Sequence, residues 1–89
     1  MSAPHLLVDV LWDFRDHAYD GDLKGASDWD AALDREAGWM GIESAELRLL
    51  LAERIGINAG DVTGAGLAGR DPLELEGLFQ SAAEREELP

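Results

Sequence analysis

The sequence predicts an all-α protein, a small helical bundle of three longer helices and one or two short ones. Apolar residues recur at intervals of three and four along most of the chain, which is the spacing of one face of an α-helix. One segment, residues 6–14, also fits the alternation of a strand, but no second clear strand is available to pair with it. A chain of 89 residues is one domain at most, and we expect that domain to span residues 4–87.

The first helix is expected over residues 4–18. Pro4 suits its first turn, where a missing N–H costs nothing, and Ser2 or Ala3 can precede it. The apolar face is formed by Leu7, Val10, Leu11 and Phe14. Aspartates occupy the opposite face, so the helix is amphipathic and one side of it should be buried.

A turn-rich linker, residues 19–27, precedes a short helix expected over residues 28–36. Ser27 and Asp30 have the spacing of a capping box, with Asp in place of the usual Glu. The apolar stripe of this helix is formed by Trp29, Leu33 and Ala37.

A stronger helix is expected over residues 41–55, with Gly56 as its C-cap. Its buried face is formed by Leu47, Leu50, Leu51 and Ile55, and Leu49 is left facing outward. The glycine-rich connection that follows leaves room for one helical turn, at about residues 61–67.

The last helix begins with Asp71 as N-cap and Pro72 at the first position, and Glu74 completes a capping box. Its inner stripe is formed by Leu75, Leu78, Phe79 and Ala82. We expect one shared core made of Leu11, Phe14, Leu47, Leu51, Ile55, Leu75, Leu78 and Phe79.

The composition limits the class of partner. The chain has 19 acidic and 7 basic residues, for a net charge of -12. Nucleic acids and anionic membranes are polyanions, so a basic protein surface is the natural complement. There is no cysteine, no apolar run of membrane-spanning length and no basic, signal-like N-terminus. These features indicate a cytoplasmic monomer.

The stretch Gly38–Ile57, "GWMGIESAELRLLLAERIGI", resembles the phosphopantetheine-attachment motif of the acyl carrier protein family. Gly38 and Trp39 match its opening, Ala45-Glu46-Leu47 the middle of its helix, and Leu51, Ile55, Gly56 and Ile57 its end. With the flanking helices, the resemblance covers about residues 5–84. It implies a carrier-like bundle whose acidic helix is recognised by the enzymes of a polyketide or fatty-acid-type pathway.

The chain departs from the family at the attachment site itself. The family's Asp-Ser-Leu falls on Met40-Gly41-Ile42, so the serine that carries 4′-phosphopantetheine is replaced by Gly41. The resemblance therefore implies a non-enzymatic protein without that cofactor. Ser44 remains open as an alternative attachment residue, because "GIES" can be aligned with the family's Gly-x-Asp-Ser.

Partner recognition is expected along the helix that starts at Gly41. Carboxylates would steer a basic enzyme surface toward the helix, and apolar side chains would hold it there. The candidate partner-binding residues are Trp39, Ile42, Glu43, Ala45, Glu46, Leu49 and Glu53. Core packing or a loop contact is the alternative explanation for Trp39 and Ile42.

Other chemistries are weakly supported by the sequence. His5 and His17 share no helix face with a third ligand, so no metal site is predicted. No catalytic arrangement of nucleophile and base can be defended, and we expect no enzyme. An acidic inhibitor or nucleic-acid mimic remains a third possible function. The interleaving of acidic residues with apolar ones, and with Arg48 and Arg54, argues against it.

Overall fold

The computed structural model describes residues 5–88 and contains five α-helices. They are α1 (Leu7–Asp20), α2 (Ala26–Met40), α3 (Ser44–Ile55), α4 (Gly64–Ala68) and α5 (Pro72–Glu87), with a 3-10 turn, η1, at Ala59–Asp61. No strand occurs within residues 5–88. The predicted fold class, an all-α small helical bundle, is confirmed.

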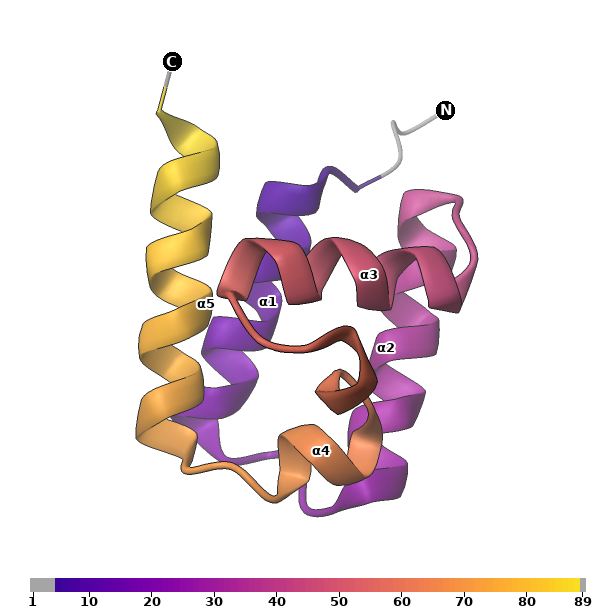
Figure 1. Ribbon diagram of the computed structural model, residues 1–89, viewed down its shortest axis with the longest axis vertical. Helices are drawn as coiled ribbons and strands as arrows, with labels where there is room; N and C mark the ends of the chain where they lie inside the picture. Colours follow the sequence, from indigo (N-terminus) through magenta and orange to yellow (C-terminus); the bar gives the residue numbers. More distant parts are fainter. Residues whose placement is uncertain (1–4, 89) are drawn as a thin grey trace.

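The first and last helices, α1 and α5, lie side by side although they are far apart in the sequence (Figure 1). The middle helix α3 runs crosswise to them and contacts both α2 and α5. The short α4 packs against α2 at the opposite end of the molecule from the end of α5. Each long helix therefore turns one face toward a common interior.

Aromatic rings join three of these helices in the core. The Phe14 ring of α1 stacks on Trp29 of α2, with centroids 5.8 Å apart, and on Phe79 of α5, with centroids 5.4 Å apart. Every residue of the predicted core is buried except Leu78, which is half-buried. Small residues complete the interior, including Ala18, Ala32, Ala37, Ala82 and Ala83.

The predicted start of the first helix is corrected by the structure. Residues 2–4 lie outside the described part of the chain, but His5 and Leu6 are not helical and α1 begins at Leu7. The Leu6 N–H donates to the Asp9 carboxylate at 3.0 Å, which caps the helix at this point. The His5 N–H donates to the Trp39 carbonyl at 3.0 Å and ties this segment to the end of α2.

The second helix is longer than predicted, and the capping box that Ser27 and Asp30 were expected to form is absent. Gly25 is the N-cap, and the Asp28 carboxylate accepts from the Lys24 N–H at 2.9 Å. With α2 extending to Met40, the bundle has four longer helices rather than three. The first connection is correspondingly short, because only residues 21–25 separate α1 from α2.

The last helix starts as predicted, with Pro72 at its first position and the Asp71 carboxylate accepting from the Leu73 N–H at 3.1 Å. The capping box predicted for Glu74 is wrong. The Glu74 carboxylate instead accepts from Arg70 at 2.7 Å, one turn earlier. Thr63, whose hydroxyl accepts from the Gly66 N–H at 3.0 Å, caps α4.

Candidate functional site

Gly41 terminates α2 and does not begin α3, which corrects the sequence-based expectation. Its backbone is left-handed, with φ 73° and ψ 27°, and its N–H donates to the Gly38 carbonyl at 3.1 Å. The Ile42 N–H donates to the Ala37 carbonyl at 3.0 Å, so the two bonds close the end of the helix. Glycine is favoured here because a side chain strains this conformation.

A serine at position 41 would therefore be strained, because a residue with a side chain rarely adopts this left-handed conformation. No atom lies within 4 Å of the place where a Cβ would stand, so the obstacle is backbone conformation alone. The helix with the acidic face begins only at Ser44, three residues further on. In this structure the residue at the start of α3 is Ser44.

The Ser44 hydroxyl is already occupied by a contact within the protein. It accepts from Arg48 Nε at 3.0 Å, one turn along α3. The Arg48 guanidinium also donates to Asp30 at 3.2 Å and to the Val62 carbonyl at 3.3 Å. Asp30 in turn accepts from the Gly64 N–H at 2.8 Å. Arg48 thus holds α3 to α2 and to the start of α4.

The outer face of α3 consists of Ala45, Glu46, Leu49 and Glu53, all of which are exposed. Leu49 is 60% exposed and lies one turn from Ala45 on one side and from Glu53 on the other. Glu43, just before the helix, is exposed as well. The predicted partner-binding residues of this helix therefore share one accessible face.

The carboxylates of this face differ in their pairing. Glu53 accepts from its neighbour Arg54 at 3.0 Å. Within residues 5–88, neither Glu43 nor Glu46 takes part in an ion pair or a side-chain hydrogen bond. Their charge is available to a cation on another molecule.

The two remaining candidates stand apart from that face. The Trp39 side chain is partly exposed, and its ring stacks on His5 at 5.1 Å and under the Arg35 guanidinium at 5.4 Å. Ile42 is half-buried and packs against the core, which agrees with core packing as the alternative explanation for this residue. Of these two candidates, only Trp39 presents an exposed side chain to a partner.

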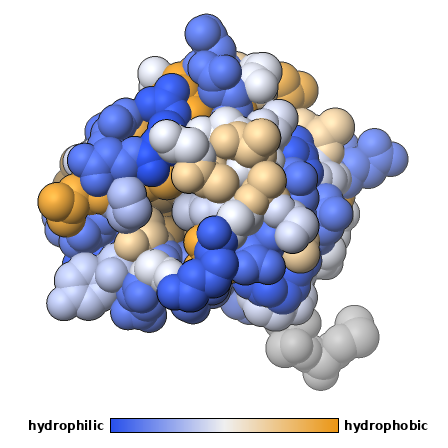
Figure 2. Space-filling view, turned by 90° about the horizontal axis from the view of Figure 1, so that it is seen from below, coloured by the Kyte–Doolittle hydropathy of each residue, from blue (hydrophilic) through white to orange (hydrophobic). Residues whose placement is uncertain are grey.

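The surface at the α4 end of the molecule differs in hydropathy from the outer face of α3. Seen from that end, a patch of near-neutral to moderately hydrophobic residues, coloured white to pale orange, lies among strongly hydrophilic ones (Figure 2). The exposed side chains of α4 are the small ones of Ala65 and Ala68. None of the residues that the sequence predicted for partner binding belongs to α4.

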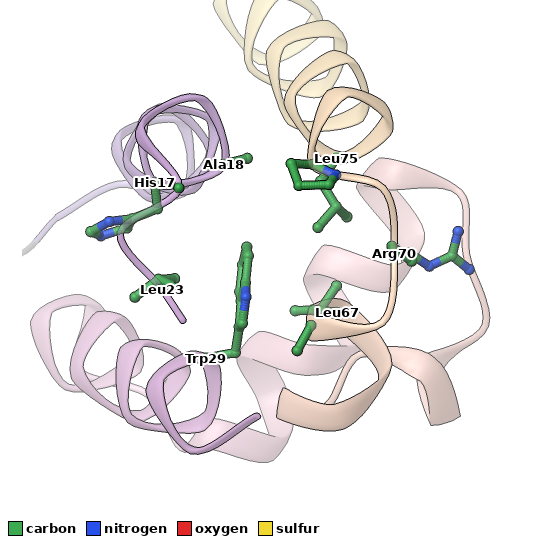
Figure 3. Close-up of a pocket in the computed structure, with 10 residues that line it drawn as sticks. His17, Ala18, Leu23, Trp29, Leu67, Arg70 and Leu75 are labelled. Carbon is green, nitrogen blue, oxygen red and sulfur yellow. The ribbon is translucent and has the colours of Figure 1, made fainter. Parts of the chain in front are cut away.

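A small open cavity of about 60 Å³ lies between the end of α1, the start of α2, α4 and the start of α5. The Trp29 indole stands between Leu23 and Leu67, and Leu75 closes the far side (Figure 3). The side chains of His17 and Arg70 point away from this space. The cavity is apolar and lacks a converging set of polar groups, which a specific ligand site needs.

A second cluster was missed by the sequence analysis, which predicted no metal ligands. His5, Asp13 and Glu36 bring their ligand atoms within 4.8 Å of one another. Glu36 is fully buried, and neither of its carboxylate oxygens has a hydrogen-bond partner among the described residues. One signal was present in the sequence: Glu36 follows Leu33 by three positions and Trp29 by seven, which places it on the apolar stripe of α2.

Burial raises the pKa of Glu36 from 4.5 to about 8, and the adjacent Asp13 carboxyl adds to this effect. The Arg35 guanidinium opposes the rise, but it is 4.0 Å away and largely exposed. Glu36 is therefore predominantly protonated at neutral pH in the folded protein.

Comparison with protein-family models, with curated proteins and with solved structures finds no significant match to this chain. None of the helices in the described part of the chain is long and apolar enough to span a membrane. Fold and composition together define a small, acidic, all-α bundle.

Proposed function

We propose that this chain is a non-enzymatic interaction protein that binds the basic surface of a partner enzyme through the outer face of α3. The partner implied by the acyl-carrier resemblance is a synthase or transferase of a polyketide or fatty-acid-type pathway. The protein would act without a phosphopantetheine arm, since Gly41 has no hydroxyl and ends a helix.

The observation that carries the proposal is the exposure of Leu49 among carboxylates. The inner face of α3 is filled by Leu47, Leu51 and Ile55, so the core does not need Leu49. Leu49 is 60% exposed, and Glu46 and Glu53 lie beside it. Protein interfaces commonly combine an apolar centre with a charged rim. The rim carboxylates accelerate encounter with a basic surface, while the apolar centre slows dissociation.

The test compares two exposed leucines. Leu49→Arg removes the apolar centre and places a cation on the acidic face of α3. Leu73→Arg makes the same change at a leucine of α5 that is 75% exposed, so both variants have the same net charge. The probes are a broad-specificity phosphopantetheinyl transferase and a ketosynthase, each titrated into isotope-labelled protein and followed by NMR.

We expect the binding-induced shift changes to centre on Glu46, Leu49 and Glu53. Leu49→Arg should weaken binding to the responsive enzyme at least tenfold, whereas Leu73→Arg should bind like the parent. Equal affinity of the two variants would contradict the proposed face. Shift changes confined to α4 or α5 would do the same.

A carrier armed at Ser44 is the second candidate function, and one observation favours it. Ser44 is the first residue of α3, directly after a three-residue connection, and it is the residue that the alternative alignment of "GIES" gives as the modified serine. Modification would have to displace the Arg48 contact at 3.0 Å. Incubation with the transferase and coenzyme A followed by intact-mass measurement decides this. An added arm that disappears in Ser44→Ala would establish the carrier function.

A further inference from the structure

A buried carboxylate of α2 faces two potential ligands from other segments. Glu36 lies in α2, Asp13 in α1, and His5 in the extended segment before α1. Their ligand atoms, one from each residue, all lie within 4.8 Å of one another. We refer to these three residues as the His5–Asp13–Glu36 cluster.

The Glu36 carboxylate is the feature that calls for an explanation. It is fully buried, and when ionised neither of its oxygens has a hydrogen-bond donor among the described residues; only the protonated form can share a hydrogen bond with Asp13. Leaving a buried polar group unpartnered costs free energy, and an unpartnered buried charge costs considerably more. The nearest guanidinium, that of Arg35, is at the 4.0 Å limit of an ion pair and also covers the Trp39 ring. A second anion, Asp13, adds repulsion that Arg35 does not balance.

Two carboxylates and an imidazole form the ligand set of a cation. Imidazole nitrogen favours first-row transition ions over Mg²⁺ and Ca²⁺, which prefer oxygen ligands only. Ligand distances of about 2.0–2.2 Å around tetrahedral Zn²⁺ separate the ligand atoms by about 3.4 Å. Because the ligand atoms lie within 4.8 Å of one another, the cluster must contract by at most about 1.4 Å. His5 is exposed and Asp13 is half-buried, so both can move toward the fixed Glu36.

The surroundings of His5 orient its imidazole without burying it. Its ring stacks on the Trp39 indole, with centroids 5.1 Å apart and 26° between the planes. Its backbone N–H donates to the Trp39 carbonyl at 3.0 Å. Groups around a metal ligand that fix its orientation raise metal affinity. The exposure of His5 leaves one side of the cluster open to a water ligand.

We propose that the His5–Asp13–Glu36 cluster binds one divalent transition-metal ion of the Zn²⁺ type. The ion would displace the proton that Glu36 carries at neutral pH, compensate the charge of the resulting carboxylate, and join the N-terminal segment to α1 and α2. Because it connects three segments, binding would stabilise the folded state. This site is separate from the outer face of α3 and does not depend on the function proposed for that face.

The full chain, first stripped with a chelator, is titrated with ZnCl₂ by isothermal calorimetry. We expect saturable binding of one ion and a rise in the thermal unfolding temperature. Glu36→Gln and His5→Ala should each weaken binding at least tenfold. The matched control is His17→Ala, since His17 is the other histidine of the chain and pairs with Asp22 at 2.8 Å. That variant should bind Zn²⁺ like the parent.

Two further measurements distinguish a built site from a generally acidic surface. MgCl₂ and CaCl₂ at equal concentration should not reproduce the stabilisation. In NMR spectra Zn²⁺ should shift the ring signals of His5 and leave those of His17 unchanged. Circular dichroism checks that each variant is folded, and Glu36→Gln is a neutral replacement of nearly equal size.

The proposal is overturned by unchanged Zn²⁺ affinity in Glu36→Gln, by equal losses in His5→Ala and His17→Ala, or by no saturable binding below millimolar Zn²⁺. Equal stabilisation by Mg²⁺ overturns it as well, because an oxygen-preferring ion would then bind without the imidazole.

Discussion

Glu36 illustrates how one side chain can make stability depend on pH. In the metal-free protein its pKa is raised to about 8, first by burial and then by Asp13, with Arg35 opposing. A carboxyl whose pKa is higher in the folded state binds a proton on folding at pH values between the two pKa values. Its contribution is favourable below its ordinary pKa of 4.5 and is lost as pH rises to about 8.

Glu36→Gln should therefore become more stable relative to the parent as pH rises from 5 to 8. The difference in unfolding free energy should grow by up to about 1.4 kcal/mol per pH unit and then level off. Urea unfolding of both proteins at several pH values, with chelator present, measures it. Comparing the two proteins cancels the titration of the other carboxylates, and a difference that is constant from pH 5 to 9 would contradict the prediction.

Two glycines show opposite constraints at the residue scale. A Cβ on Gly64 would lie 2.0 Å from the Ala26 backbone oxygen and 2.6 Å from the Asp30 carboxylate. Gly77, in the middle of α5, has no atom within 4 Å of the same position. Glycine at position 64 permits the close approach of α4 to α2, whereas glycine at position 77 only weakens a helix.

We expect Gly64→Ala to destabilise the fold by about 1–3 kcal/mol or more, because backbone has to move. Gly77→Ala should stabilise it by about 0.5–1 kcal/mol, because alanine is the better helix former. Urea denaturation of both variants and the parent tests the pair. Shifts of the same sign would mean that the α2–α4 approach is looser than described.

At the scale of the element, α3 separates a structural face from an exposed one. Leu47, Leu51 and Ile55 are buried, whereas Leu49 is 60% exposed. Substitution of leucine by alanine keeps helix propensity high, so a stability difference between the two faces reports packing.

Leu51→Ala should cost about 2–4 kcal/mol, because it removes buried methyl groups and leaves a cavity. Leu49→Ala should change stability by less than about 0.5 kcal/mol. Chemical denaturation measures both values. A Leu49→Ala variant as unstable as Leu51→Ala would mean that Leu49 belongs to the core and is not a contact for a partner.

The helices were predictable from apolar spacing, and so were the end of α3 at Gly56 and the start of α5 at Pro72. The starts of the first three helices, the end of α2 and the lateral contacts were not. Gly38 was expected to lie beyond the second helix, yet α2 continues through it because Gly41, three residues later, provides the left-handed cap. The outer face of α3 could be predicted from the helical spacing of its leucines. The His5–Asp13–Glu36 cluster could not be predicted from sequence spacing, because its side chains meet only after three segments have packed together.

On the scale of the whole molecule, the net charge of -12 creates a field that no single contact describes. Exposed charges interact over roughly 10 Å at 0.1 M salt, so a basic partner would be attracted before contact. The orientation of the final complex would still be decided by short-range contacts such as Leu49.

The association rate with a basic partner enzyme should fall steeply as salt rises, while the dissociation rate should change less. Stopped-flow or surface-plasmon measurements at 0.05 and 0.5 M NaCl give both rates. A partner that associates equally fast at both concentrations would contradict electrostatic recruitment.

The pairing of α1 with α5 also has a consequence for how fast the protein folds. Phe14 and Arg15 of α1 reach Phe79 and Gln80 of α5, so these contacts close a loop that contains α2, α3 and α4. Closing so long a loop costs chain entropy before any contact is gained. We therefore expect the contacts between α1 and α5, the α1–α5 seam, to form after the folding transition state. Weakening these contacts should shorten the lifetime of the native state. In a chevron experiment, Phe79→Leu should speed unfolding and leave refolding nearly unchanged, whereas slowed refolding would place the seam in the folding nucleus.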